Sequence, residues 1–210
     1  MKTKFLTFCK AWTEVTNIPF AALGIAYLGI YSIEVIYASN KVLVSNLEKL
    51  GNLIWLVFIF DLIIRFVSSD SLLNFLKNNF IELLAVTLPF LRVLRMLRVL
   101  LAVRGLRIFV VDRARATGVY VALLAPLTWF TGAIVVLDVE SGNSSSTINS
   151  LGKALWWALT TITTVGYGDL YPITTSGKFV AAVLMITGIS LFSAGAGLFA
   201  NWILEDKKNK

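Results

Sequence analysis

Long apolar runs separated by short polar stretches make up most of this chain. A helix of roughly 17–25 apolar residues crosses a bilayer, and runs close to that length occupy residues 18–38, 51–67, 118–137 and 174–203. A shorter run, 80–90, is followed almost at once by the arginine-bearing segment 91–107, and we expect these two to form a helical hairpin. The pattern predicts an all-α membrane protein with six transmembrane helices.

Composition supports this prediction and narrows the function. Of the 210 residues, 57% are hydrophobic and 15% are charged, whereas soluble domains are about a quarter charged. The net charge of +7 could suggest a nucleic-acid partner, but the basic residues lie at the ends of apolar runs, as in proteins whose cytoplasmic loops are positive. We therefore expect membrane lipid and no nucleic acid as a partner, with both termini cytoplasmic. Histidine is absent and Cys9 is the one cysteine, which argues against an enzyme, a resident metal or a disulfide.

The most specific signal follows residues 151–162, an apolar stretch too short to cross the membrane and therefore predicted to be a re-entrant helix. The next residues read TVGYG (164–168) and then Asp169. Non-helical backbone at this depth must line a water-filled path or be buried in protein. Gly166 and Gly168 can adopt positive φ, so alternating backbone handedness would turn successive carbonyls to one side. Such carbonyls replace the hydration shell of a cation. A dinucleotide-binding loop is excluded because it needs a preceding strand and a third glycine.

The stretch ALWWALTTITTVGYGDLYP (154–172) resembles the voltage-gated potassium channels, most closely their compact archaeal members and in particular one from a methanogen. The resemblance in the pore covers residues 118–203. It implies a homotetramer in a prokaryotic cell membrane, with K⁺ as the permeant ion, no cofactor, and pore-blocking toxins or cations as ligands.

The same resemblance assigns roles to residues around the filter. It implies that the Thr164 hydroxyl and four backbone oxygens bind K⁺ in a filter that ends at Gly168; the oxygens are those of Thr164, Val165, Gly166 and Tyr167. It also implies that Trp156, with Trp157 beside it, supports the filter by a hydrogen bond to Asp169. Anchoring at the membrane interface is the alternative for both tryptophans.

The arginine-bearing segment is the second unusual feature. Its arginines follow a three-residue period in which Leu101 occupies one place: Arg92, Arg95, Arg98, Arg104 and Arg107. Each charge that moves through 100 mV gains about 2.3 kcal/mol, so three charges in each of four subunits would gain on the order of 25 kcal/mol. We interpret the segment as a voltage-sensing helix. A basic helix that lies on anionic lipid is the alternative.

Acidic residues inside the apolar runs are the predicted partners of these arginines. Asp61 and Glu82 lie in the second and third runs, and Glu34 lies toward the outer end of the first. Phe58 stands three residues before Asp61. The resemblance implies that Phe58, Asp61 and Glu82 form the narrow site through which the arginines move.

Two further interpretations concern gating. The resemblance makes Gly188 a hinge in the last span, with close helix packing as the alternative. Residues 108–117, which include Asp112, Arg113 and Arg115, are predicted to couple the sensor to the pore. A potassium channel with a static sensor-like domain remains an alternative function, and a cation transporter is a more distant one. The predicted division is a cytoplasmic segment 1–17, a four-helix voltage sensor 18–110, a connector 111–117, a pore domain 118–203 and a cytoplasmic tail 204–210.

Overall fold

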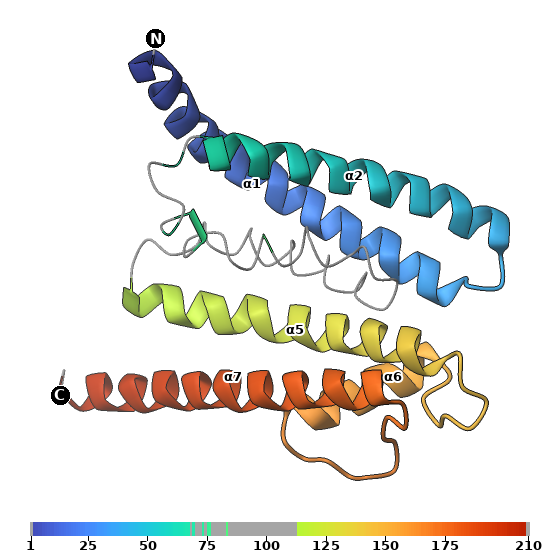
Figure 1. Cartoon of the computed structure of the whole chain (residues 1–210). Coiled ribbons are helices and arrows are strands. Elements are labelled where there is room, and N and C mark those ends of the chain that lie inside the picture. Colours follow the sequence, from blue (N-terminus) through green and yellow to red (C-terminus); the bar gives the residue numbers. More distant parts are fainter. Residues whose placement is uncertain are drawn as a thin grey trace. The chain divides into compact units, whose positions relative to one another are not determined.

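The computed structural model describes residues 2–67, 69, 73, 75–76, 83 and 113–208. Every regular element in these ranges is a helix, which confirms the predicted all-α class. The chain divides into two compact units, Met1–Ile108 and Phe109–Lys210 (Figure 1). The arginine-bearing segment and Glu82 lie outside the described residues. The roles assigned to Glu82 and to the five arginines therefore stay predictions: Arg92, Arg95, Arg98, Arg104 and Arg107.

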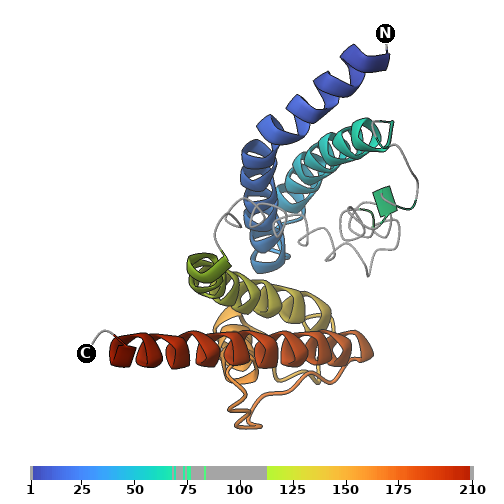
Figure 2. The same cartoon turned by 90° about the vertical axis from the view of Figure 1, so that its left-hand side faces the viewer.

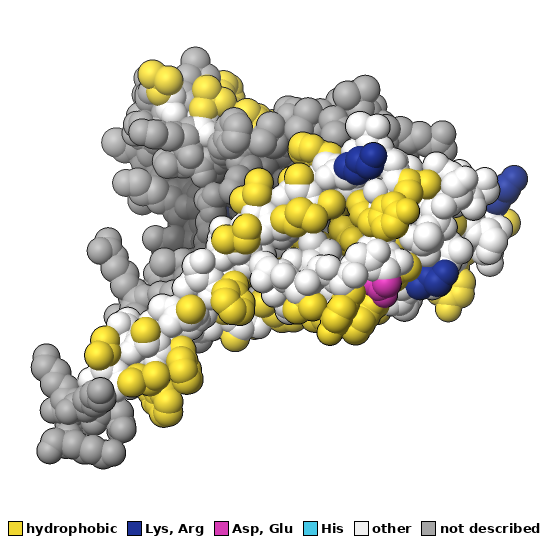
Figure 3. All heavy atoms as spheres, turned by 90° about the horizontal axis from the view of Figure 1, so that it is seen from below, with side chains coloured by type: hydrophobic (Ala, Val, Ile, Leu, Met, Phe, Trp, Pro, Cys, Tyr) yellow, Lys and Arg dark blue, Asp and Glu magenta, His cyan; other side chains and the backbone are white. Residues whose placement is uncertain are grey.

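The chain spans a membrane. Within the described ranges, three helices are long and apolar enough to cross it, Lys41–Val67, Val121–Glu140 and Thr175–Leu204, and a shorter apolar stretch covers Ala22–Ile36. Figure 3 shows one face on which the described surface is largely apolar and the few charged side chains gather toward one end. The total of six crossings stays a prediction.

Helix α1, Lys2–Ile36, begins earlier than predicted. We expected a span that opens at Pro19, but Pro19 lies inside the helix. An internal proline removes one backbone hydrogen bond and kinks a helix without necessarily ending it, and α1 changes direction in its N-terminal half (Figure 2). The helix therefore extends before the apolar run 18–38, where Trp12 contacts α2 as described below. The division between a cytoplasmic segment and a membrane span stays a prediction.

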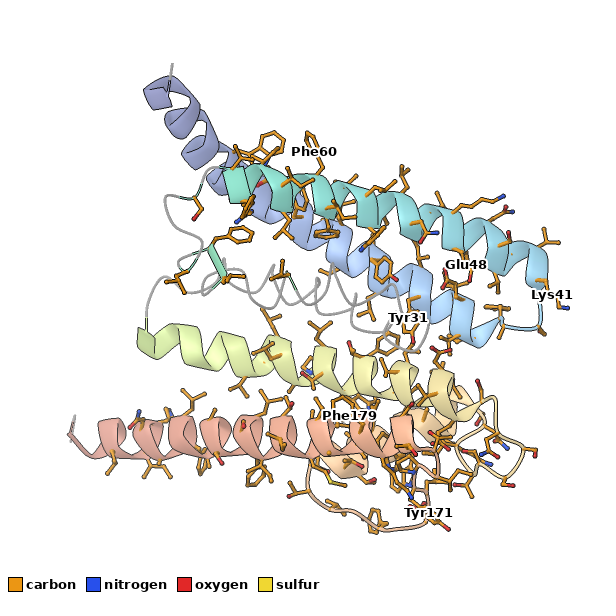
Figure 4. The ribbon with its side chains drawn as sticks, in the orientation of Figure 1. Tyr31, Lys41, Glu48, Phe60, Tyr171 and Phe179 are labelled. Atoms are coloured by element: carbon orange, nitrogen blue, oxygen red, sulfur yellow. The ribbon has the colours of Figure 1, made fainter. Side chains whose placement is uncertain are left out.

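Helix α2, Lys41–Val67, also begins earlier than predicted. The apolar run 51–67 is preceded by the polar stretch 40–49, yet Lys41 already starts the helix at the hairpin turn, and Glu48 projects from it (Figure 4). Asn40 explains this start: its Oδ1 accepts a hydrogen bond from Leu43 N at 3.1 Å. An asparagine N-cap of this kind satisfies a backbone donor that would otherwise lack a partner.

Helices α1 and α2 pack together through aromatic and aliphatic side chains. The buried cluster in this unit is Phe20, Phe58, Leu62 and Phe75. The rings of Phe20 and Phe58 meet edge to face with centroids 5.2 Å apart, an arrangement that aromatic quadrupoles favour. Phe60, by contrast, points away from α1 (Figure 4) and is exposed. The hairpin thus buries one face of α2 and leaves the other for its surroundings.

The second unit contains α5 (Arg113–Glu140), α6 (Leu151–Ile162) and α7 (Thr175–Lys208). Helices α5 and α7 run side by side in opposite directions, and α6 lies at the end where α5 finishes and α7 begins (Figure 1). Trp129 Nε1 of α5 donates to Leu155 O of α6 at 2.8 Å. Helix α5 starts at Arg113, so residues 113–117 of the predicted connector are helical and continuous with it. The coupling role of the connector stays a prediction.

Candidate functional site

The short helix α6 matches the predicted re-entrant helix residue for residue, Leu151–Ile162. Its last carbonyl groups accept hydrogen bonds from the segment that follows. Thr164 N donates to Thr161 O at 3.1 Å, and Gly166 N donates to Thr160 O at 3.0 Å. The first residues of the TVGYG segment are therefore fixed to the C-terminal turn of α6, whose dipole carries partial negative charge.

Backbone handedness alternates along this segment. Thr164, Gly166 and Gly168 have φ values of 61°, 55° and 78°. Positive φ costs glycine little, which agrees with the prediction for Gly166 and Gly168. At Thr164 it costs about 1–2 kcal/mol, and the sequence analysis did not anticipate it. Gly166 and Gly168 are two residues apart, and extending this spacing by two residues toward the N-terminus would have predicted positive φ at Thr164.

Trp156 joins the helix to the far end of the segment. Its Nε1 donates to Asp169 Oδ2 at 2.8 Å, so the expected hydrogen bond is present. Its ring also stacks on Tyr167, with centroids 5.6 Å apart and planes 6° from parallel. Trp157 points elsewhere and is buried in the unit. The structure therefore brings Trp156, Tyr167 and Asp169 together beside the filter segment.

Glu140, at the end of α5, is a structural residue that the sequence analysis did not identify. It is fully buried, and its Oε2 accepts from Ser146 Oγ at 2.6 Å. Its Oε1 accepts from Thr174 N at 2.9 Å and from Thr174 Oγ1 at 2.7 Å. One carboxylate thus joins the end of α5, the following loop and the start of α7. The sequence feature that could have identified Glu140 is an acidic residue placed where an apolar run ends.

Gly188 allows α7 to approach the end of α6. A Cβ atom at this position would lie 2.6 Å from Ile162 O, closer than real contacts allow. The structure therefore supports the close-packing interpretation of Gly188. Helix α7 is straight in Figures 1 and 2, and the hinge role stays a prediction.

The first unit holds a second buried carboxylate, that of Asp61. Asp61 and Phe58 lie one turn apart on α2 and are 0% and 2% exposed. Asp61 Oδ2 accepts from Arg65 Nε at 2.9 Å, and Asp61 Oδ1 accepts from Trp12 Nε1 at 3.0 Å. The sequence analysis missed both donors. Arg65 could have been found from the four-residue spacing that makes neighbours on a helix.

Glu34 does not join this group. It lies near the end of α1, at the hairpin turn, whereas Asp61 lies near the opposite end of α2 (Figure 1). With a rise of about 1.5 Å per residue, the roughly 18 residues between their levels correspond to about 27 Å. The two acids are therefore placed at different depths in the hairpin.

Comparison with known proteins agrees with this geometry. The ion channel family matches residues 124–205. A voltage-gated potassium channel of Aeropyrum pernix is 44% identical over 75 residues, which cover 36% of this chain and 25% of that protein. The voltage-gated potassium channel regulatory subunit KCNG3 of Homo sapiens is 29% identical over 174 residues, or 65% of this chain and 39% of the human one.

A cyclic nucleotide-gated potassium channel of Rhizobium etli is 31% identical over 81 residues, or 39% of this chain and 23% of that channel. The chain therefore covers only about a quarter to two fifths of these relatives. The residues that the ion channel family matches, 124–205, contain α6 and the alternating backbone. The chain is thus similar to voltage-gated potassium channels, and its residues 124–205 match the ion channel family.

Proposed function

We propose that this chain is the subunit of a homotetrameric, potassium-selective channel whose conductance is controlled by membrane voltage. The observation that carries the proposal is the alternation of positive φ at Thr164, Gly166 and Gly168. Alternating handedness points successive carbonyl oxygens to the same side, where they can replace the water around a K⁺ ion. The proposed ligands are the Thr164 hydroxyl and the backbone oxygens of Thr164, Val165, Gly166 and Tyr167.

Exposure of the segment supports assembly with further copies. Val165 and Tyr167 are 53% and 67% exposed in the single chain. A single strand offers oxygen atoms from one side only, so enclosing a cation requires equivalent strands from other subunits. In this proposal the channel lies in the cell membrane and both termini are cytoplasmic.

The pair Phe58 and Asp61 supports the voltage-sensing part of the proposal. A buried carboxylate inside the membrane is costly unless cations pair with it, and this one already accepts a bond from Arg65. In the proposed mechanism the arginines of segment 91–107 pass this carboxylate when the membrane potential changes. The energy available, on the order of 25 kcal/mol for twelve charges through 100 mV, is large enough to drive a conformational change.

Purified protein in a planar bilayer under a potassium–sodium gradient tests the pore. We expect currents that reverse close to the potassium equilibrium potential, and steps to both voltage polarities reveal the direction of gating. Gly168→Ala should lose selectivity because alanine disfavours a φ of 78°. Gly152→Ala is the matched control, because an added methyl group would meet open space at both glycines and only Gly168 has positive φ. Equal sodium and potassium permeation in the wild type would contradict the proposal.

Gating-charge recording separates the voltage-gated channel from its alternatives. A potassium conductance that is the same at all voltages, with no displaced charge, would identify a channel whose sensor-like domain is static. A reversal potential that follows a second, coupled ion would instead identify a transporter.

A further inference from the structure

The N-terminal part of α1 packs on α2. Trp12, Thr16 and Phe20 are spaced four residues apart and therefore share one face of the helix. Thr16 and Phe20 are buried, and Thr16 Oγ1 donates to Trp12 O at 2.7 Å. Phe20 meets Phe58 edge to face. Trp12 lies one turn before Thr16 on this face. It belongs to residues 1–17, which were predicted to be a separate cytoplasmic segment.

Trp12 reaches the carboxylate of Asp61 from a different helix. Arg65 binds one carboxylate oxygen from within α2 itself, whereas Trp12 Nε1 binds the other oxygen from α1 at 3.0 Å. With a donor on each oxygen, the plane of the carboxylate is fixed. A carboxylate can accept about four hydrogen bonds, and these two set the orientation of its two oxygens.

An indole N–H is a suitable donor to a carboxylate that must bind mobile cations, as is proposed for Asp61. The indole N–H is a donor only and carries no charge. It therefore orients the carboxylate without neutralising it and without competing for it as a second fixed cation would. A hydrogen bond to a charged group is also stronger than one between neutral groups.

We propose that Trp12 is a positioning residue of the charge-transfer site: its indole N–H holds the carboxylate of Asp61 in the orientation that receives the mobile arginines. This inference rests on the proposed voltage-sensing function. It assigns the N-terminal segment to the sensor, so that loss of the Trp12 N–H changes the energy of sensor positions and leaves the pore intact.

The test is gating-charge recording on the full chain with Trp12→Phe and with a tryptophan analogue in which sulfur replaces the ring N–H. Both changes remove the donor, and the analogue keeps the shape of the ring, so it decides the question if the phenylalanine variant folds poorly. We expect a displaced midpoint that corresponds to an about tenfold change in the equilibrium between sensor positions at fixed voltage. The limiting slope, which reports the number of charges, should not change.

Trp55→Phe is the matched control. Trp55 lies six residues before Asp61 on α2, and six residues turn a helix by about 600°, which places the two side chains about 120° apart. Wild-type protein that moves no charge would overturn voltage sensing and this inference together. Wild-type charge movement with unchanged midpoints in both Trp12 variants would overturn the role of Trp12 alone.

Discussion

Replacing Glu140 by alanine tests whether one buried carboxylate holds the pore unit together at its loop end. The side chain is fully buried, and it accepts three hydrogen bonds from two residues, Ser146 and Thr174, at 2.6, 2.9 and 2.7 Å. Alanine removes all three acceptor contacts and leaves the donors without their partner. The connection between the end of α5, the loop and the start of α7 would then be lost.

The expected loss of stability follows from these contacts. Hydrogen bonds to charged groups contribute about 1.5–3 kcal/mol each, but two of the three share the single oxygen Oε1. Counting about 2 kcal/mol for each carboxylate oxygen gives about 4 kcal/mol. Glu140→Gln should cost only about 1–2 kcal/mol, because its amide oxygen can still accept from Thr174 and its amide nitrogen can donate to Ser146 Oγ.

Thermal unfolding of the full chain in detergent measures this difference. At about 2–4 °C per kcal/mol for a chain of this size, Glu140→Ala should lower the midpoint by about 10 °C. Asp138→Ala is the matched control, because Asp138 lies on the same last turn of α5 and is exposed. If the two alanine variants unfolded within about 2 °C of each other, the proposed clamp would be refuted. Equal losses for Glu140→Ala and Glu140→Gln would refute the argument from hydrogen-bond geometry.

Three further substitutions test the local contacts. Trp156→Phe removes the 2.8 Å bond to Asp169 and should reduce the potassium-to-sodium permeability ratio by about tenfold, measured from reversal potentials. Gly188→Ala would place a methyl group 2.6 Å from the last carbonyl oxygen of α6 and should cost about 1–3 kcal/mol in thermal unfolding, whereas Gly195→Ala, which has open space, should not destabilise. Asn40→Ala removes the cap of α2 and should cost about 1 kcal/mol, seen as faster hydrogen exchange confined to the first turn of that helix.

The features of the pore unit that follow from local rules could be predicted from the sequence. The length of α6 is set by an apolar run between polar residues, and both of its ends were predicted correctly. Positive φ at Gly166 and Gly168 follows from the freedom of glycine. The bond from Trp156 to Asp169 was expected from resemblance to a family.

Features that depend on particular side-chain contacts, local or between distant segments, do not follow from the hydropathy pattern. Polar residues after Asn40 look like a loop in a hydropathy profile, yet the cap at Asn40 starts a helix there. Pro19 looks like a helix start, but α1 continues through it, and Trp12 before it binds Asp61 of α2. In each case a side-chain contact outweighed the intrinsic preference of the backbone.

The two buried carboxylates show why such contacts decide function as well as fold. Asp61 and Glu140 are both fully buried acids near the end of a long helix; Asp61 lies inside an apolar run, and Glu140 lies where one ends. Within the described residues, the donors to Glu140 are neutral hydroxyl or backbone groups of the loop and of Thr174. This suits a residue that connects structural elements in one fixed arrangement. Asp61 instead accepts from a cation on its own helix, Arg65, and from the neutral indole of Trp12. The indole orients this carboxylate without adding a second fixed positive charge, and that is the property that the proposed site for moving arginines requires.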